Sequence, residues 1–509
     1  MVEVYCDGVS AGPARTGLAG TFAGAGGGPG SGLDMFEVSV RVPQGRDRVE
    51  LTGVGHPCVG EPFALRPWSA QVEPQKPKEW SAAREALVRS RNADRLTALR
   101  AALRFATTDA VVPGRLPRVL VVTHDLGLGG GQLYLQELVR RLHRRGLTLS
   151  VVSLRGGRLV DELEELGIPV LVTGAADVHD PEAYESHVLQ LASWAVEHGS
   201  EAALVNTMSA FSGADAAHRI RLPIVWAIHE SYPFSQYWTE AHGPGVHPRV
   251  VERGAESLAA ARCVVFEAEA THRLYVPSIR DGAGVVVPYG VDLSEIADYQ
   301  RTSDRAAVRR ELGFSESTRV LLCMGTVEPR KAQVSLVQAF AGSDRLAGAD
   351  VRLVFVGGRD GEPYDDVLRE AIESYADDRI MLEPVQPHIE RWYLAADVLV
   401  CASDVESLPR SMLEVMAFGR PIASTSVFGI PELVDDGVTG FLCESRDLLE
   451  LRRMLERVCG TSADELTALG AAAREVVLRR HDPMIFEEFY LERLTTLAAD
   501  NELEPSGRL

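Results

Sequence analysis

Lysine is nearly absent from this chain of 509 residues. It occurs only as Lys76, Lys78 and Lys331, so the total of 52 basic residues less three leaves 49 arginines. Lys76 and Lys78 lie in a proline-rich stretch, which leaves Lys331 alone in the part of the chain that we expect to fold. A single lysine kept in an arginine-rich chain indicates a site that needs a compact ammonium rather than a planar guanidinium.

Excess positive charge, cysteine motifs and long apolar runs are missing as well. Acidic residues number 72 against 52 basic ones, and the net charge of −20 argues against electrostatic binding to nucleic acid. Seven cysteines without a CxxC spacing argue against a disulfide framework and favour a reduced, cytoplasmic chain. No apolar run approaches membrane-spanning length and no basic stretch precedes an apolar one at the N-terminus, so we expect neither a signal peptide nor a transmembrane helix.

From Arg118 onward, short apolar strands alternate regularly with helices. Alternation of this kind is typical of parallel sheets covered by helices, and here two series follow in tandem. We therefore predict an α/β fold of two Rossmann-like, doubly wound domains facing a cleft, where a nucleotide and a second substrate can meet. The strands are expected at Val119–Thr123, Leu149–Leu154, Val170–Thr173, Ala203–Asn206, Ile224–Ile228, Val264–Glu267 and Val285–Val287, and then at Val320–Gly325, Arg352–Val356, Ile380–Leu382, Val398–Cys401, Ile422–Ser424 and Gly440–Leu442.

These patterns divide the chain into five parts. Residues 1–75 form a mostly β appendage, and residues 76–115 form a linker with an amphipathic helix at Glu79–Phe105. The Rossmann-like domains occupy 116–288 and 289–482, with a hinge at Pro288–Asp292, and a C-terminal helix and tail occupy 483–509. Strands of the appendage are expected at Val2–Tyr5, Phe36–Val42 and Arg48–Leu51.

Two glutamates lie eight residues apart between a strand and a helix, in Glu406-Ser407-Leu408-Pro409-Arg410-Ser411-Met412-Leu413-Glu414. The segment begins at the carboxyl edge of the predicted second sheet, where ligands of open α/β sheets bind. At about 1.5 Å per residue the carboxylates are roughly 12 Å apart, whereas a hydrolase pair needs about 5 to 9.5 Å. They could instead hold two ends of one extended ligand. The alternative is that Glu406 favours the helix N-terminus and Glu414 pairs with Arg410.

A glycine-rich turn, Gly129-Gly130-Gly131, joins the first strand of the first domain to a helix. Glycines let backbone N–H groups and the positive helix end approach an anion or a polyol. The turn is not a dinucleotide fingerprint, because Gln132 replaces the third glycine and the second strand ends at Leu154-Arg155 without an acidic residue for a ribose. The alternative is an ordinary tight turn.

Two cations follow the first strand of the second domain, in Gly325-Thr326-Val327-Glu328-Pro329-Arg330-Lys331. They stand at the start of a helix predicted at Ala332–Ala341, where the helix dipole disfavours positive charge. A bound anion would supply the compensation, so we interpret Arg330 and Lys331 as a diphosphate clamp. The alternative is a pair of solvated basic side chains.

Two further groups are open to two interpretations each. His229-Glu230 follows the apolar strand Ile224–Ile228 and either contacts a substrate or makes structural hydrogen bonds. Basic residues end the helix predicted at Gln132–Arg145 and either complement its negative end or touch an anionic membrane surface. These basic residues are Arg140, Arg141, Arg144 and Arg145.

Together these segments resemble the retaining glycosyltransferases of family 4, which have the GT-B fold. The resemblance covers roughly Pro117 to Leu497 and extends to the hinge and to the block Phe428–Gly440. It implies that Glu414 holds the ribose of a nucleotide and that Glu406 holds the donor sugar. It also implies that the final helix, Pro483–Leu497, crosses back onto the first domain.

The remaining site residues are placed by the same resemblance. Arg330 and Lys331 would neutralise the leaving diphosphate, and His229 would lie by the sugar near the reacting carbon. Gly130 and Gly131 would lie near the diphosphate or the acceptor. The implied donor site is completed by Gly325, Ser407 and Leu408.

The resemblance implies an enzyme that moves a sugar from a UDP- or GDP-sugar to a hydroxyl group, with retention and without a metal or other cofactor. The acceptor would be a glycan, a lipid-linked glycan or a small molecule, in polysaccharide, glycolipid or glycoconjugate assembly. Nucleic acid is not an expected partner, whereas the inner face of the membrane could be contacted through the four arginines. Two alternatives stay open: a nucleotide-sugar epimerase or phosphorylase of the same architecture, and a non-catalytic binding or scaffold protein.

Three positions depart from the family pattern. Thr326 stands where many members have Arg, Ala332 where many have Gly, and Phe428 where a first Gly is usual. We therefore expect the clamp to rely more on Arg330 and the donor pocket to be narrowed by Phe428.

Overall fold

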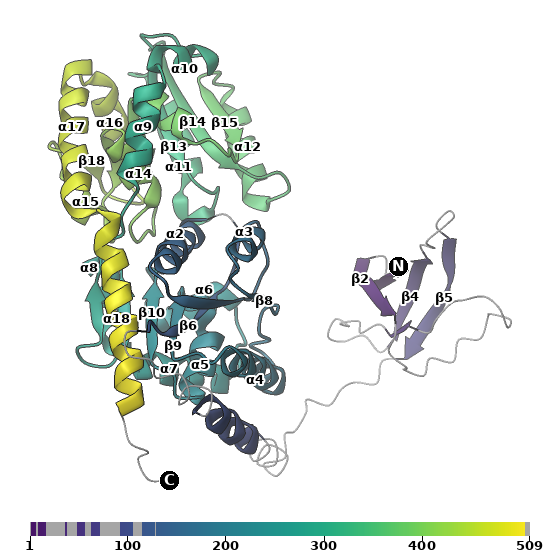
Figure 1. Ribbon diagram of the computed structural model, residues 1–509. Helices are drawn as coiled ribbons and strands as arrows, with labels where there is room; N and C mark the ends of the chain where they lie inside the picture. Colours follow the sequence, from purple (N-terminus) through teal and green to yellow (C-terminus); the bar gives the residue numbers. More distant parts are fainter. Residues whose placement is uncertain are drawn as a thin grey trace. The chain divides into compact units, whose positions relative to one another are not determined.

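The computed structural model describes five N-terminal strands and residues 92–104, 115–127 and 129–503 (Figure 1). The chain divides into two units, Met1–Asn92 and Ala93–Leu509. In the first unit the strands form an antiparallel sheet in the order β3-β2-β1-β4-β5. Their bounds are β1 Val2–Cys6, β2 Val9–Thr16, β3 Phe36–Glu37, β4 Arg48–Gly55 and β5 Phe63–Gln71.

The prediction of a mostly β N-terminal part is confirmed, with differences in detail. β2 runs into the glycine-rich stretch where no strand was predicted, because pairing with β1 satisfies its backbone groups in spite of poor strand propensity. β5 was not predicted either, and it pairs with β4. Residues 38–42 of one predicted strand lie outside the described residues, as does the predicted helix apart from residues 92–104.

The first parallel sheet has seven strands in the order β12-β11-β10-β9-β6-β7-β8. Every neighbouring pair is parallel, and β9 and β10 are buried at each position, as expected of strands with helices on both faces. The strands are β6 Arg118–Thr123, β7 Thr148–Ser153, β8 Val170–Val172, β9 Ala202–Asn206, β10 Ile224–Ile228, β11 Cys263–Phe266 and β12 Gly284–Val286. The helices are α2 Gly130–Arg144, α3 Leu159–Glu165, α4 Pro181–Glu197, α5 Phe211–Arg219, α6 Phe234–His242, α7 Pro248–Ala260 and α8 Glu269–Tyr275.

The second parallel sheet has six strands in the order β15-β14-β13-β16-β17-β18. The strands are β13 Arg319–Met324, β14 Val351–Gly358, β15 Ile380–Pro384, β16 Val398–Cys401, β17 Ile422–Thr425 and β18 Gly440–Cys443. The helices are α9 Leu293–Thr302, α10 Arg305–Glu311, α11 Gln333–Ala341, α12 Pro363–Tyr375, α13 Glu390–Ala395, α14 Arg410–Ala417, α15 Ile430–Leu433, α16 Leu448–Gly460, α17 Ala463–Arg480 and α18 Pro483–Leu503. Each predicted strand of both series matches an observed one to within one or two residues, so the predicted fold of two parallel-sheet α/β domains is confirmed. Over the described part of the chain, no helix is long and apolar enough to cross a membrane.

The chain passes between the two sheets twice, and the two crossings touch. The Val291 N–H donates to the His481 carbonyl (3.2 Å), and His481 Nδ1 lies 2.7 Å from the Tyr289 carbonyl. A Cβ atom on Gly290 would lie 2.4 Å from Cα of Pro483, so the two backbones are in direct contact. The hinge segment predicted from the sequence therefore lies against the start of α18.

Helix α18 then packs on α2 and β9 of the first sheet (Figure 1). It buries Phe486, Tyr490 and Leu494 completely. The Tyr134 hydroxyl of α2 donates to the Tyr490 hydroxyl at 2.8 Å, which satisfies both buried polar groups.

Residues around α15 join the second half of the molecule, which contains the second parallel sheet, to the start of α8. Glu432 of α15 accepts hydrogen bonds from the backbone N–H groups of Glu269 (2.9 Å) and Ala270 (2.8 Å), so a carboxylate meets the positive end of a helix in the opposite half. Next to it, a Cβ on Gly429 would lie 2.4 Å from the Ser407 carbonyl oxygen and 2.6 Å from Cβ of Ala268. Only glycine fits at this point.

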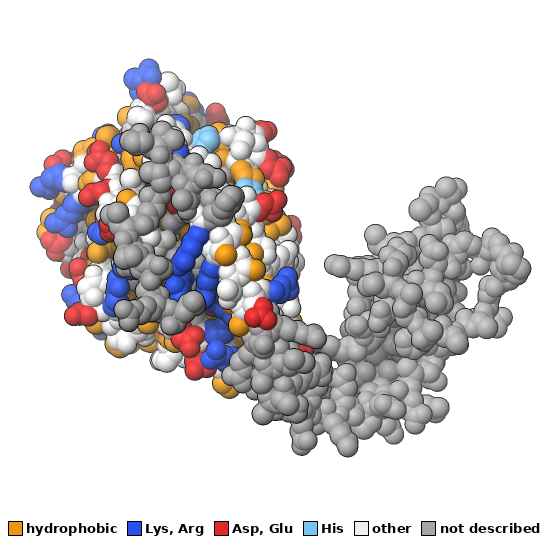
Figure 2. Space-filling model, turned by 60° about the horizontal axis from the view of Figure 1, so that its bottom comes forward, with side chains coloured by type: hydrophobic (Ala, Val, Ile, Leu, Met, Phe, Trp, Pro, Cys, Tyr) orange, Lys and Arg blue, Asp and Glu red, His pale blue; other side chains and the backbone are white. Residues whose placement is uncertain are grey.

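Surface charge is mixed, in keeping with the composition. Figure 2 shows Lys and Arg side chains near the centre of one face, with acidic side chains toward its edges. Arg100 in the helix 92–104 donates through Nε to the Arg219 carbonyl at 2.6 Å. Burial lowers the pKa of Arg100, and the nearby Arg221, Arg219 and Arg104 lower it further.

Candidate active site

The predicted cations and the first glutamate meet where β13 and β16 end, at the carboxyl edge of the second sheet. Glu406 lies in the loop after β16, with only 11% of its side chain exposed. Its Oε2 is 3.0 Å from Lys331 Nζ, 3.4 Å from Arg330 NH1 and 3.2 Å from Ser403 Oγ. The structure thus gathers residues that are about 75 positions apart in the sequence into one buried cluster.

Opposite charges keep this cluster ionised in spite of its burial. Burial raises the pKa of Glu406, but Lys331 and Arg330 outweigh that effect and bring the pKa below its usual range. Burial likewise lowers the pKa of Lys331, and Glu406 more than reverses it. The charge that we expected a bound anion to supply is supplied here by Glu406, together with Glu328, whose Oε2 is 2.7 Å from Arg330 Nε.

Both cations keep donors for a ligand. Lys331 has three donors and uses one on Glu406. Arg330 bonds through Nε and NH1, and among the described residues no hydrogen bond uses its NH2 group. A diphosphate could therefore be bound without breaking the contacts that place the two side chains.

Backbone geometry fixes the loop that carries the cations. Arg330 and Lys331 lie in a short 3₁₀ turn, and the Arg330 carbonyl accepts from the Asp404 N–H at 2.7 Å, which ties this loop to the loop of Glu406. Gly325 has φ +134°, and a Cβ there would lie 3.6 Å from Lys331 Nζ. The ammonium therefore lies directly over the backbone of the predicted phosphate-binding loop.

The second glutamate, Glu414 in α14, is held by two donors. Arg410 Nε lies 2.6 Å from its Oε1, and the Tyr393 hydroxyl lies 2.8 Å from its Oε2. The pairing with Arg410 is the structural alternative that the sequence left open. An ionised carboxylate offers about four acceptor positions, so Glu414 retains capacity for two further hydroxyl donors.

A second polar cluster lies at the carboxyl edge of the first sheet. His229 follows β10, with Nδ1 2.9 Å from Glu267 Oε1 and Nε2 2.8 Å from Asn206 Oδ1. Asn206 donates through Nδ2 to the Gly131 carbonyl (3.2 Å), which turns its Oδ1 toward the imidazole. Both ring nitrogens face oxygen acceptors, an arrangement that favours the protonated ring. Burial lowers the pKa of His229, but Glu267 outweighs it and the pKa is raised.

Thr207, beside this cluster, has a backbone conformation that is nearly exclusive to glycine, with φ 72° and ψ 157°. Such strain costs about 1–3 kcal/mol and persists where the surroundings impose it. Its N–H donates to the Ala227 carbonyl (2.8 Å), and its carbonyl accepts from Trp226 Nε1 (2.9 Å). Its Oγ1 lies 2.9 Å from His124 Nδ1, which directs this polar side chain to the same edge.

Four members of this second cluster, at the edge of the first sheet, were not predicted as site residues. Their shared position is the signal that could have found them, because each follows a buried strand directly or ends one. They are His124, Asn206, Thr207 and Glu267.

The two clusters face each other. Ser231 Oγ and Thr271 Oγ1 are 3.0 Å apart, and Thr271 Oγ1 lies 3.1 Å from Ser407 Oγ, which links the end of β10 to the loop of Glu406. Burial raises the pKa of Tyr232, and Arg330 of the opposite half acts against that shift, which places the phenol near the cations. Within the described residues, no group of three or more His, Cys, Asp or Glu side chains could hold a metal ion.

The predicted glycines and Leu408 have distinct surroundings. A Cβ on Gly131 would lie 3.6 Å from the His229 ring, whereas a Cβ on Gly130 would meet no atom within 4 Å. Gly130 therefore borders open space beside the second cluster, at the edge of the first sheet. Leu408 is buried in the core instead, with 8% exposed, next to Ser407.

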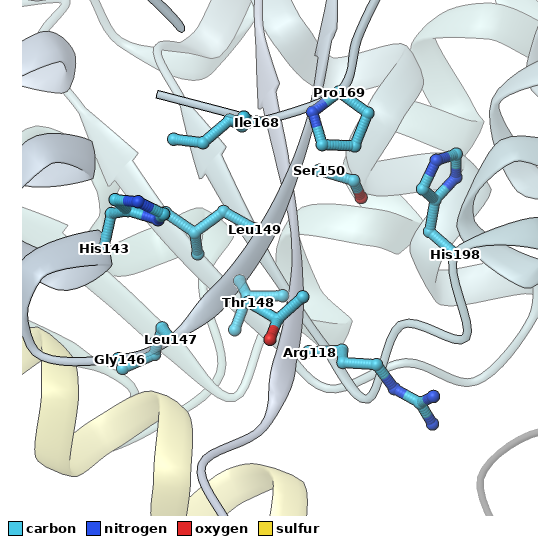
Figure 3. A pocket seen from close by; sticks show the side chains of 12 residues that line it. Arg118, His143, Gly146, Leu147, Thr148, Leu149, Ser150, Ile168, Pro169 and His198 are labelled. Carbon is cyan, nitrogen blue, oxygen red and sulfur yellow. The ribbon is translucent and has the colours of Figure 1, made fainter. Parts of the chain in front are cut away.

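A pocket of about 280 Å³ lies at the opposite edge of the first sheet (Figure 3). It is lined by the starts of β6 and β7 and by residues just after α2 and α4, including Arg118, Gly146 and His198. Figure 3 shows His143 and His198 on opposite sides of β7. No member of either cluster lines it, so this pocket is separate from the candidate site.

The four arginines at the end of α2 differ in their surroundings. Arg141 is only 11% exposed and pairs with Glu137, Asp292 and Glu487. Arg145 also pairs with Glu487 (2.7 Å), and Arg140 pairs with Glu162 (2.5 Å). Arg144 is exposed and donates to the Arg140 carbonyl (3.3 Å).

The chain matches two family models, Glycosyltransferase Family 4 over residues 128–295 and Glycosyl transferases group 1 over residues 318–460. It is 31% identical over 357 residues to the D-inositol 3-phosphate glycosyltransferase of Xylanimonas cellulosilytica, covering 63% of this chain and 81% of that relative. It is 28% identical over 360 residues to the protein of the same name from Thermomonospora curvata, covering 65% and 82%. The crystal structure of Anabaena Alr3699/HepE in complex with UDP-glucose matches 75% of this chain and 100% of that chain, with a TM-score of 0.61 and 21% identity. The chain therefore belongs to glycosyltransferase family 4 and is a glycosyltransferase with the GT-B fold.

Proposed function

We propose that this protein transfers a sugar from a UDP- or GDP-sugar to a hydroxyl group with retention of configuration. The observation that carries the proposal is the buried cluster of Arg330, Lys331 and Glu406. Two ionised cations with unused donors suit a nucleoside diphosphate, whose charge must be neutralised before it can leave. The UDP-glucose bound to HepE supports a UDP-sugar as the first donor to assay.

Each half has its own task in this proposal. The domain 289–482 binds the donor: Glu414 accepts hydrogen bonds from the ribose hydroxyls, and Glu406 does so from the sugar. Backbone groups of Gly325, Ser407 and Leu408 line the same site. The domain 116–288 binds the acceptor, with Gly130, Gly131 and His229 beside the reacting carbon.

The transfer needs little covalent chemistry from the protein. The bond between the anomeric carbon and the diphosphate oxygen breaks as the acceptor oxygen attacks from the same face, and the departing phosphate takes the acceptor proton. Arg330 and Lys331 stabilise the charge that develops on the diphosphate, and contact between the halves excludes water. We propose that these cations and backbone amides suffice without a metal, so that a chelator leaves the rate unchanged.

The acceptor belongs, in this proposal, to polysaccharide, glycolipid or glycoconjugate assembly in the cytoplasm. A peripheral contact with the inner face of the membrane would use Arg140, Arg144 and Arg145, because Arg141 is enclosed by ion pairs. Sedimentation with anionic vesicles tests this contact, and an Arg140→Gln/Arg144→Gln variant should sediment less.

A donor panel with mixed acceptors tests the main proposal, read as nucleotide release together with the anomeric configuration of the product. Glu406→Ala should lower kcat by about 100- to 1,000-fold with little change in nucleotide affinity. Glu414→Ala should weaken nucleotide binding by about 10- to 100-fold, since it removes hydrogen bonds to a charged group. Equal losses of affinity in both variants would contradict these roles.

The same donor panel separates the alternatives. Inversion at a carbon of the donor sugar without transfer would favour an epimerase, and donor binding without turnover would favour a non-catalytic protein.

A further inference from the structure

We infer that Glu137, a residue of the first half, positions the ribose-binding carboxylate Glu414 of the second half by way of Arg410. The inference rests on the proposed role of Glu414. It makes Glu137 a positioning residue for the donor, although Glu137 lies outside the donor domain and touches neither sugar nor phosphate in the proposal.

Arg410 joins the two glutamates directly. Its Nε lies 2.6 Å from Glu414 Oε1 and its NH1 lies 3.4 Å from Glu137 Oε2. The guanidinium also lies over the Tyr289 ring, 5.1 Å from the centroid, and the Arg410 side chain is 22% exposed. Groups from α14, α2 and the hinge therefore enclose one planar fork, which is the geometry for which arginine is better suited than lysine.

Glu137 is itself held in place by Arg141, one turn further along α2. Arg141 donates to its other oxygen, Oε1, through Nε (3.2 Å) and NH2 (3.1 Å), which leaves Oε2 for Arg410. Arg141 is anchored in turn by Asp292 of the hinge (3.5 Å) and by Glu487 of α18 (3.2 Å). The direction of the Glu137 carboxylate is thus set by the two chain crossings.

Without Glu137, one side of the partly buried guanidinium would lose its charged partner. Arg410 would then be free to turn toward water and would hold Glu414 less firmly. A carboxylate that must receive two ribose hydroxyls at once needs a fixed plane, so looser orientation weakens binding. The same helix, α2, begins at the Gly130–Gly131 turn, so the ribose site is complete only while α2 and α14 keep their present distance.

The first experiment measures UDP binding by calorimetry in the full chain, with GDP as the second probe. Glu137→Gln should raise the Kd for the preferred nucleotide by about threefold to tenfold, which lies in the lower part of the range for coupled neighbours. The donor KM should rise by a similar factor while kcat changes less. Glu162→Gln is the matched control, because Glu162 pairs with Arg140 on α2 and has no contact with Arg410, and it should leave the Kd unchanged.

A double-mutant cycle separates positioning from general damage. In an Arg410→Met background, Glu137→Gln should cause no further loss of affinity, because its effect passes through Arg410. Additive losses, or an unchanged Kd in Glu137→Gln, would overturn the inference while leaving the proposed function standing. A wild-type protein that binds neither UDP nor GDP would overturn both. If Glu137→Gln does not fold, Arg410→Lys tests the same link, and wild-type affinity in that variant would refute it.

Discussion

The ammonium of Lys331 lies between the Glu406 carboxylate, 3.0 Å away, and the backbone of Gly325, with 17% of its side chain exposed. A guanidinium is longer and planar, so it would displace one of these neighbours. We expect Lys331→Arg to lower kcat/KM by roughly 10- to 100-fold, the equivalent of a charged hydrogen bond. Lys331→Met should lower kcat/KM by a similar factor, because it removes the charge.

Steady-state kinetics with the donor in excess would check this. The matched comparison is Arg330→Lys, which keeps a cation on the more exposed side of the cluster and should lose less activity. Wild-type rates in Lys331→Arg would show that the lone lysine has no special role.

The raised pKa of His229 gives a second prediction, on the pH dependence of stability. Glu267 and Asn206 face its nitrogens and the Tyr134 ring packs against it, 4.7 Å between centroids. The folded-state pKa is raised above the unfolded value of about 6.5. A group of this kind stabilises the fold fully below the unfolded pKa and loses that contribution as pH rises through the folded pKa. The stability advantage of the wild type over His229→Gln/Glu267→Gln should therefore be largest below about pH 6.5 and should shrink as the pH rises above it.

Urea unfolding at several pH values measures that difference, and the double variant removes both titrating groups so that neither is left unpaired. A difference that stays constant with pH would mean that the pKa of His229 is the same in the folded and unfolded protein, and a difference that grows with pH would mean that folding lowers the pKa.

Among the structural elements, the two departures from glycine noted in the sequence share one geometry. Ala332, at the start of α11, has φ 49° and Phe428, before α15, has φ 46°. This left-handed region costs a non-glycine residue about 1–2 kcal/mol, while glycine adds unfolded-state entropy worth about 0.4–1 kcal/mol. Ala332→Gly should therefore stabilise the protein by about 0.5 kcal/mol.

Ala468→Gly is the control, since Ala468 is exposed inside α17 and its replacement should destabilise by about 1 kcal/mol. Thermal or denaturant unfolding compares the two. Equal losses in both variants would show that the backbone at Ala332 is relaxed. The narrowing of the donor pocket by Phe428 stays a prediction, and the side chain packs partly buried against the core.

The elements also show how far the sequence could lead. The strands follow from short apolar runs, and the second-sheet site could be predicted because Arg330, Lys331 and Glu406 lie in contiguous motifs at strand ends. His229 of the first-sheet cluster was predicted as well, but Asn206, Glu267 and His124 were not, because they come from different strands and their strand-end positions point to one site only once the sheet order is known. Glu137 looked like an ordinary charged residue on a helix face. Nothing in the sequence indicates the strained backbone of Thr207, because a β-branched residue is not expected at positive φ.

For the whole molecule, the two parallel sheets share a core through α18, whose Tyr490 is fully buried against the first half. We expect one cooperative unfolding transition for residues 93–503 in the wild type. Tyr490→Ala should cost about 3–5 kcal/mol and let the first sheet open before the second. Tyr490→Phe, which removes only the hydroxyl contact with Tyr134, should cost about 1 kcal/mol.

Hydrogen exchange resolved by segment checks this, since β6 to β12 should lose protection ahead of β13 to β18 in Tyr490→Ala. Simultaneous loss in all strands would show that α18 does not hold the halves together.

The fit at Gly429 sets a limit on motion. A methyl group there would overlap the Ser407 carbonyl within the second half and Cβ of Ala268 in the first half, so the halves have no room to move closer where Gly429 meets Ala268. Any relative rotation must pivot about this contact or open away from it, and cannot carry it further inward. Gly429 therefore limits how far the two halves can close, and a larger residue in its place would change the angle between them.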